Sequence, residues 1–203
     1  MSPKIVNKEE KKAEIIHAAM IVFAKRGLVK TKMIDIAEQA GIGKGTIYEY
    51  FRSKEDIFAT AFQYFFSEMT TAIESILADT EDPVEQLKLL MTESLNSLQH
   101  VGSDFAAIMM DFWAEGIRNK DQRILSIINL KKIYENYRRT IRTILEDGIS
   151  KGVFKPVNTL YTSAVLIAAF DGLILQWIMD RELIDLEKVT NVLISNFLEG
   201  IKK

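Results

Sequence analysis

The chain has 203 residues, 48% of them hydrophobic and 27% charged, which allows one large domain or a small domain joined to a larger one. It contains no cysteine, and its two histidines lie far apart, so disulfides and thiolate metal sites are excluded and we expect no metal or cofactor. No N-terminal apolar stretch resembles a signal peptide, which favours a soluble, cytoplasmic protein.

The charge is distributed unevenly along the chain. Residues 1–54 contain 11 basic and 6 acidic residues, a net charge of +5, whereas residues 55–203 contain 15 basic and 22 acidic residues, a net charge of -7. A basic N-terminal part on an acidic remainder suits a protein that presents one end to a polyanion.

Residues 1–7 are expected to form a loose arm, because Pro3 delays any helix. From Lys8 to Arg26 the apolar residues recur at helical spacing, and Gly27 supplies a stop signal. We therefore predict a first amphipathic helix over residues 8–26.

Residues 33–50 (MIDIAEQAGIGKGTIYEY) predict two short helices joined by a tight turn. Ala37 is small enough for a second helix to cross closely, and Gly41 can take the left-handed conformation that ends the first. With Ile36 and Ile47 turned inward, Lys44, Gly45, Thr46, Tyr48 and Glu49 remain at the start and on the outer face of the second helix. In a helix-turn-helix these N-terminal and outer positions read the major groove.

The segment IDIAEQAGIGKGTIYEYFRSKEDIF resembles the DNA-binding signature of the tetracycline-repressor (TetR) family of bacterial regulators. The resemblance covers about the first quarter of the chain. It implies a homodimeric regulator whose grip on DNA changes when a small molecule binds its C-terminal part. It also implies that Tyr48, Tyr50 and Lys54 contact the duplex, with Lys54 as a phosphate ligand.

The pattern departs from the family in two places. The family has two consecutive threonines before its Ile-Ala helix, whereas this chain has Thr31 and Lys32; Thr31 can cap the helix or bond a phosphate, and Lys32 can supply charge. Tyr50 stands where many relatives have histidine. The predicted DNA-binding residues are Thr31, Lys32, Lys44, Gly45, Thr46, Tyr48, Tyr50 and Lys54.

The rest of the chain predicts helices as well. Ser53 is a natural N-cap for a long helix to about Leu77, and Asp82-Pro83 restarts a helix to Gln99. Gly102-Ser103-Asp104 predicts a break before a helix to Ile117. A further helix runs towards Gly152 and has a basic, solvated face. The expected fold is all-α with about nine helices, divided into a helix-turn-helix domain at 1–52 and a ligand-binding and dimerisation domain at 53–203.

Two apolar helices end the chain. Residues 160–180 are strongly apolar, but Asp171 and Gln176 interrupt the roughly 18 apolar residues that a membrane span needs, so we expect a buried helix and no membrane. The last helix is capped by Asp185. We expect both helices to pair with their copies in a second chain, as the resemblance also implies. The predicted interface residues are Leu166, Phe170, Gly172, Leu173, Leu193 and Phe197.

Aromatic and methionine side chains are frequent in the C-terminal part and can line an adaptable apolar pocket. Each of them can equally be core. The candidate ligand-binding residues are Phe62, Phe66, Met69, Met91, Met110, Trp113, Tyr137, Phe170 and Trp177.

Catalysis has little support, since no nucleophile-base-acid, metal or phosphate-loop pattern is visible. The sequence predicts a repressor that binds near-palindromic operator DNA as a homodimer, with its two recognition helices about 34–36 Å apart or somewhat further. A small apolar effector would release it or alter its binding. Two alternatives remain open: a DNA binder of the same fold without an effector, and a helical small-molecule carrier or enzyme with a vestigial helix-turn-helix.

Overall fold

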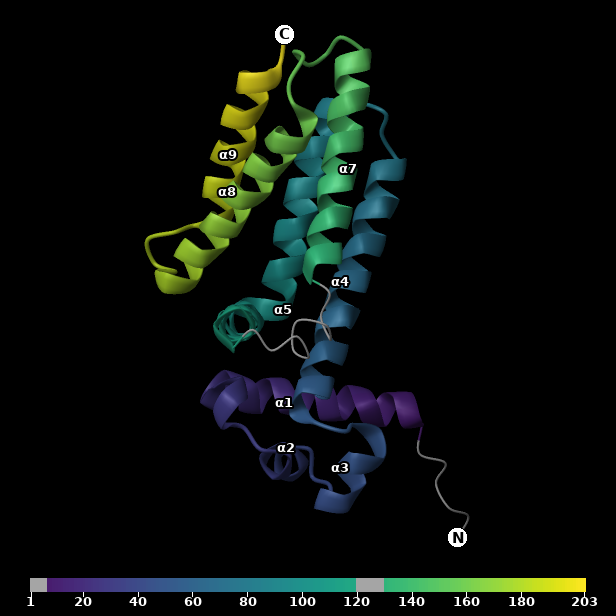
Figure 1. The fold of residues 1–203 in the computed structure, drawn as a ribbon, viewed down its shortest axis with the longest axis vertical. Helices are drawn as coiled ribbons and strands as arrows, with labels where there is room; N and C mark the ends of the chain where they lie inside the picture. The colour runs from purple at the N-terminus through teal and green to yellow at the C-terminus, as the bar shows by residue number, and fades with distance from the viewer. Residues whose placement is uncertain (1–6, 120–129) are drawn as a thin grey trace. The chain divides into compact units, whose positions relative to one another are not determined.

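A computed structural model describes the backbone of residues 7–119 and 130–203, together with the side chains of these ranges except residues 100–103, 111–119 and 130. The described residues are helical apart from turns and short connectors, which confirms the all-α class (Figure 1). They form two compact units, residues 7–66 with 104–119 and residues 67–103 with 130–203. The domain boundary at residue 52 stays a prediction.

The first unit begins with α1 (Lys8–Lys30), α2 (Met33–Gln39) and α3 (Lys44–Tyr50). As predicted, the first straight helical segment ends at Gly27, whose φ of 72° interrupts α1 before a last short turn. α1 packs on α2, and α2 on α3. The core of this bundle includes Ile15, Phe23, Ile36 and Ile47, each at most 1% exposed.

α4 (Lys54–Ala78) and α5 (Pro83–Asn119) contribute residues to both units. Their starts follow the predicted caps: Ser53 Oγ accepts from Asp56 N at 3.2 Å, and Asp82 Oδ1 accepts from Val84 N at 3.0 Å. The predicted break at residues 102–104 is wrong, because helical hydrogen bonding continues through it. A glycine within a helix costs only about 1 kcal/mol, which neighbouring interactions can offset. The same residues coincide instead with the boundary between the units.

The second unit is completed by α7 (Leu130–Ser150), α8 (Thr159–Met179) and α9 (Leu186–Ile201). α8 packs on both α7 and α9 (Figure 1). In the connector before α8, the Phe154 ring is fully buried and lies directly over Gly148, where a Cβ would stand 2.1 Å from the ring. Lys155 N donates to Ile201 O at 2.8 Å, which ties this connector to the end of α9.

Candidate DNA interface and effector-binding residues

The turn between α2 and α3 has the geometry that the sequence predicts. Gly41 has a φ of +64°, which L side chains rarely adopt. Around it, Gly41 N donates to Glu38 O at 3.1 Å and Ile42 N donates to Ala37 O at 3.0 Å. Gly43 is the N-cap of α3, and its carbonyl accepts from Ile47 N at 3.3 Å. These bonds fix the direction in which α3 leaves the turn.

The two faces of α3 differ in exposure. Ile47 is fully buried and Phe51, just after the helix, is 4% exposed, so this side is closed against the bundle. Lys44, Gly45 and Glu49 are exposed, Tyr48 is 50% exposed, and Thr46 and Tyr50 are half-buried. A Cβ built at Gly45 would meet nothing within 4 Å, so a duplex could approach the backbone there. The predicted groove-reading residues therefore share one accessible surface.

Thr31 does not have the role that was predicted for it. Its side chain is only 2% exposed, and its hydroxyl donates to Gly27 O at 2.8 Å, which ties it to the end of α1. The N-cap of α2 is Lys32, whose N–H donates to Asp35 Oδ2 at 2.9 Å. That hydrogen bond lowers the pKa of the Asp35 carboxyl, and Arg26 at 3.0 Å lowers it further, although burial acts against both. Lys32 remains exposed and available, whereas the Thr31 side chain has no free surface for a phosphate.

Lys54 has backbone partners that the sequence did not predict. Its ammonium donates to three backbone carbonyls, those of Leu28 at 2.7 Å, Val29 at 2.9 Å and Thr31 at 2.9 Å. An ammonium has three N–H donors, so these bonds use all of them. The structure therefore shows Lys54 as a cap for the end of α1, and a phosphate contact from this side chain stays a prediction.

The candidate ligand-binding residues are divided between the two units. In the first unit, Phe62 is fully buried and lies in a run of aromatic contacts, with its ring centroid 4.5 Å from Phe66 and 6.4 Å from Phe105. Met110 is half-buried in the same unit. The Trp113 side chain lies outside the described residues.

The other candidates lie in the second unit, where Met91 and Phe170 are buried and Met69, Tyr137 and Trp177 are half-buried. Two polar pairs that sequence reasoning did not identify lie in this unit. The Tyr137 hydroxyl is hydrogen-bonded to Ser94 Oγ, and the Tyr134 hydroxyl donates to Asp171 Oδ2 at 2.8 Å. Burial raises the pKa of Asp171, although the bond from Tyr134 opposes the rise. These polar groups could orient a ligand. The two pairs could not be predicted from the sequence, because their members are 43 and 37 residues apart.

The predicted dimer-interface residues on α8 need correction. Leu166 is 1% and Phe170 is 7% exposed, so both belong to the core of their own unit. Gly172, Leu173, Leu193 and Phe197 are half-buried. The most exposed large apolar side chains of α8 and α9 are others: Tyr161, Val165, Leu175, Met179 and Val192, each at least 47% exposed. The α8 members are separated by four, ten and four residues, which places them along one side of the helix.

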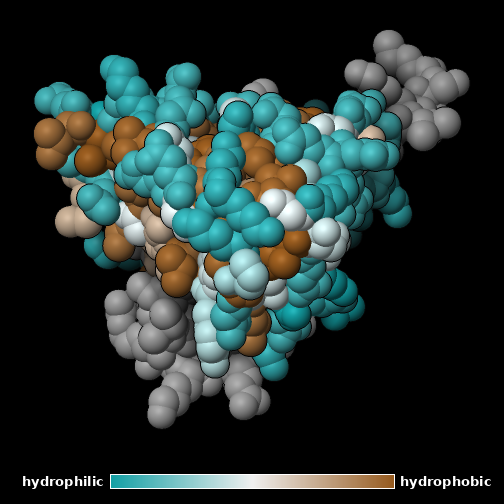
Figure 2. Space-filling model, turned by 90° about the horizontal axis from the view of Figure 1, so that it is seen from above, coloured by the Kyte–Doolittle hydropathy of each residue, from teal (hydrophilic) through white to brown (hydrophobic). Residues whose placement is uncertain are grey.

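Figure 2 shows hydrophobic side chains among hydrophilic ones on the face at the end where the C-terminus lies in Figure 1. By length and composition alone, α8 could cross a membrane, a test that the core helices of soluble proteins also pass. Within α8, Asp171 and Gln176 interrupt the apolar sequence, and the Asp171 carboxylate accepts a hydrogen bond from Tyr134 at 2.8 Å.

Two family models match the chain. Residues 15–61 match the bacterial regulatory proteins of the tetR family, and residues 83–201 match the C-terminal part of BetI-type transcriptional repressors. The fatty acid metabolism regulator protein of Bacillus subtilis is 27% identical over 195 residues, which cover 96% of this chain and 97% of that protein.

Solved structures agree with these matches. The fatty acid degradation regulator FadR of Bacillus halodurans has a TM-score of 0.76 at 26% identity and covers 94% of this chain and 95% of its own. FadR of Bacillus subtilis in complex with stearoyl-CoA has a TM-score of 0.78 at 25% identity and covers 93% of this chain and 98% of its own. Because the C-terminal family model spans more than half of the chain and the N-terminal one spans the helix-turn-helix, the chain belongs to the TetR family of bacterial transcriptional regulators.

Proposed function

We propose that the chain is a repressor that forms a homodimer and binds near-palindromic operator DNA through α3 of each protomer. One observation carries this proposal: α3 buries Ile47 while it leaves Lys44, Gly45 and Tyr48 on an accessible outer face. Lys44 can neutralise a phosphate, and Thr46 and Tyr48 can reach base edges or the backbone. The net positive charge of residues 1–54 supports the same face.

The proposed dimer forms through the exposed stripe of α8 and α9, with Val165, Leu175, Met179 and Val192 in place of Leu166 and Phe170. A two-fold axis through these helices would cover the stripe of each chain with its copy. The half-buried Gly172, Leu173, Leu193 and Phe197 lie on the same two helices and stay in the proposed interface.

The proposed effector is a small molecule with a long apolar portion, held by the aromatic and methionine side chains. The support comes from the Bacillus subtilis FadR structure, whose ligand is stearoyl-CoA, and from the residues available here. α4 and α5 each continue from one unit into the other, so a ligand that prefers one arrangement of the second unit can bias the first. The relatives are named as transcriptional regulators, which favours this reading over a carrier or enzyme.

DNA binding can be tested with duplexes selected from a random pool by the protein, followed by fluorescence anisotropy over a range of salt concentrations. Lys44→Gln is expected to weaken binding to all selected duplexes and to reduce the salt slope by about one per recognition helix. Lys131→Gln, at a lysine 86% exposed on α7, is the matched control and should change neither. If no duplex is selected, or if both variants behave alike, the proposed DNA face is wrong.

A further inference from the structure

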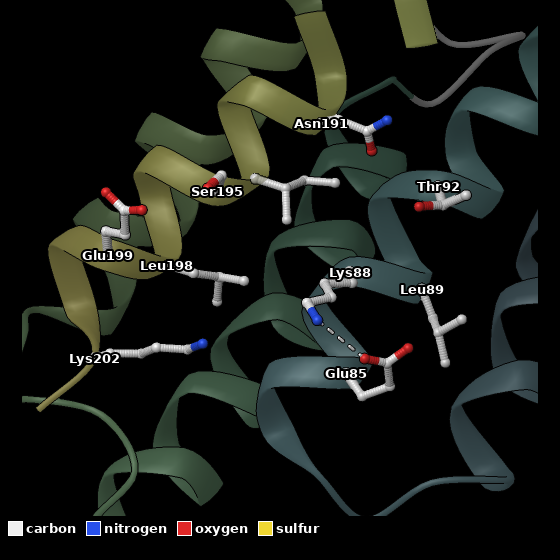
Figure 3. A pocket seen from close by; sticks show the side chains of 10 residues that line it. Glu85, Lys88, Leu89, Thr92, Asn191, Ser195, Leu198, Glu199 and Lys202 are labelled. Atoms are coloured by element: carbon white, nitrogen blue, oxygen red, sulfur yellow. Dashed lines mark hydrogen bonds and ion pairs between the residues drawn. The ribbon is translucent and has the colours of Figure 1, made fainter. Parts of the chain in front are cut away.

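A cavity of about 410 Å³ lies in the second unit between the first turns of α5 and residues 191–202 of α9 and its C-cap (Figure 3). Its volume falls within the roughly 300–1,000 Å³ of small-molecule sites. None of the aromatic or methionine candidates for the effector lines it. It is therefore a separate place at which this chain could bind a ligand.

The cavity has an aliphatic floor. Leu89, Ile194 and Leu198 line it, and the last two are 7% and 4% exposed, so their positions are fixed by the core beneath. Contact with this floor would take the apolar part of a ligand out of water, which favours binding.

Two cations converge at one end of the cavity. In Figure 3 the ammonium groups of Lys88 and Lys202 both point inward from opposite sides, one from α5 and one from the end of α9. Lys88 is 3.4 Å from Glu85 Oε2, whereas the Glu199 carboxylate points away from Lys202 and no bond joins Lys202 to another of the side chains drawn. One anionic group placed between the two ammoniums would pair with both.

The other end of the cavity is polar but uncharged. Thr92 from α5 and Asn191 and Ser195 from α9 line it, and all three are exposed. Their hydroxyl and amide groups can donate to and accept from one polar group of a ligand. The order along the cavity is therefore a charged end, where Lys88 and Lys202 stand beside Glu85 and Glu199, then the aliphatic floor, then the hydrogen-bonding end.

We propose that this cavity is a second binding site, and that it takes a small aliphatic carboxylate with a hydroxyl or amide group at its far end. The carboxylate lies between Lys88 and Lys202, the methylene chain covers Leu89, Ile194 and Leu198, and the far polar group meets Thr92, Asn191 or Ser195. The site is independent of operator binding and of the apolar effector.

The test uses 6-hydroxyhexanoate as the probe and the full chain without DNA, with binding followed by backbone amide shifts in NMR spectra. We expect saturable shifts at residues 88–92 and 191–202 in the millimolar range, weakened by added salt. The double variant Lys88→Gln/Lys202→Gln should bind the probe about fivefold to thirtyfold more weakly. Lys188→Gln, on an exposed lysine of the same helix, is the matched control and should bind as the parent does.

Neutral 6-hydroxyhexanamide separates charge recognition from contact with the floor, and it is expected to bind at least fivefold more weakly than the acid. Absence of saturable binding, equal binding of acid and amide, or full binding by the double variant would each overturn the proposal. Thermal melts of both variants check that they fold. Operator binding by the double variant should be unchanged, so failure here is distinct from failure of the proposed regulatory function.

Discussion

The ammonium of Lys54, the first residue of α4, lies 2.7 Å from the carbonyl oxygen of Leu28 in the last turn of α1. The same ammonium bonds the carbonyls of Val29 and Thr31, so one side chain satisfies acceptors that the end of a helix leaves without partners. It thereby joins α4 to the segment from which α2 starts. Lys54 can influence DNA binding through this junction without touching DNA.

Replacing Lys54 should first reduce stability. Lys54→Met keeps the aliphatic stem but leaves three carbonyls without the ammonium, and hydrogen bonds to charged groups are worth about 1.5–3 kcal/mol each when buried. With the side chain 19% exposed, water can replace part of this, and we expect a loss of about 2 kcal/mol in the free energy of unfolding. Urea denaturation measures it.

The control for this variant is Lys44→Gln, which removes an exposed lysine from α3 and should leave the unfolding midpoint unchanged while it weakens DNA binding. A Lys54→Met protein with the stability of the parent and weakened affinity for all duplexes would instead identify Lys54 as a phosphate ligand. Such a result would restore the interpretation that the sequence alone suggested.

The two glycines at Gly41 and Gly45 should respond in opposite ways to alanine. Gly41→Ala meets no atom within 4 Å but must hold a φ of +64°, so it should cost about 1 kcal/mol of stability. Gly45→Ala has ordinary helical geometry and free space, so it should gain about 0.5 kcal/mol.

The added methyl at residue 45 lies on the face proposed to meet the duplex. We expect Gly45→Ala to weaken operator binding about tenfold, comparable to one mismatched base pair. Thermal melts and anisotropy titrations on the same samples measure both effects. A stabilised Gly45→Ala variant with full operator affinity would place the groove contact elsewhere on α3.

The helix-turn-helix could be predicted because its signals are local. Four local signals lie within 12 residues: Gly41, the small Ala37, and the inward Ile36 and Ile47. Each of them favours the same structure, two short helices joined by a tight turn. The role of Lys54 could not be predicted, since its partners lie 23 to 26 residues earlier and are backbone atoms, which carry no sequence signal. The inward direction of Leu166 and Phe170 was likewise hidden, because α8 is apolar on most of its surface and offers no polar face from which to read its orientation.

Asp171 should make stability depend on pH in an unusual direction. Burial raises the pKa of this carboxyl above its ordinary value of 3.8, so the folded chain holds the proton to a higher pH than the unfolded chain. The folded state then binds more protons between the two pKa values, and the contribution of this group to stability falls as the pH rises through that window. Below the ordinary value both states are protonated and the group contributes nothing.

Asp171→Asn removes this ionisation and keeps an oxygen that can accept from Tyr134. The stability of the variant relative to the parent is therefore expected to increase as the pH rises above about 4. Urea denaturation at several pH values measures the difference. A difference that stays constant over this range would show that the carboxyl titrates as an exposed aspartate does.

The last prediction concerns the oligomeric state. Val165 is 64% exposed in the middle of the apolar stripe on α8, and in the proposed dimer it faces its copy across a two-fold axis. Val165→Glu would bring two carboxylates together in an apolar interface, where desolvation and repulsion add, so we expect a monomer by analytical ultracentrifugation. Tyr64→Glu, at a side chain 67% exposed on α4, is the matched control and should sediment as the parent does.

The monomer should also bind DNA more weakly than the dimer. A dimer gains affinity because its two recognition helices bind both half-sites of a palindromic duplex, and a monomer has only one such helix. Its affinity for a palindromic duplex should therefore be no higher than its affinity for a single half-site. A Val165→Glu protein that remains a dimer would exclude this stripe as the centre of the interface, even if DNA binding persisted.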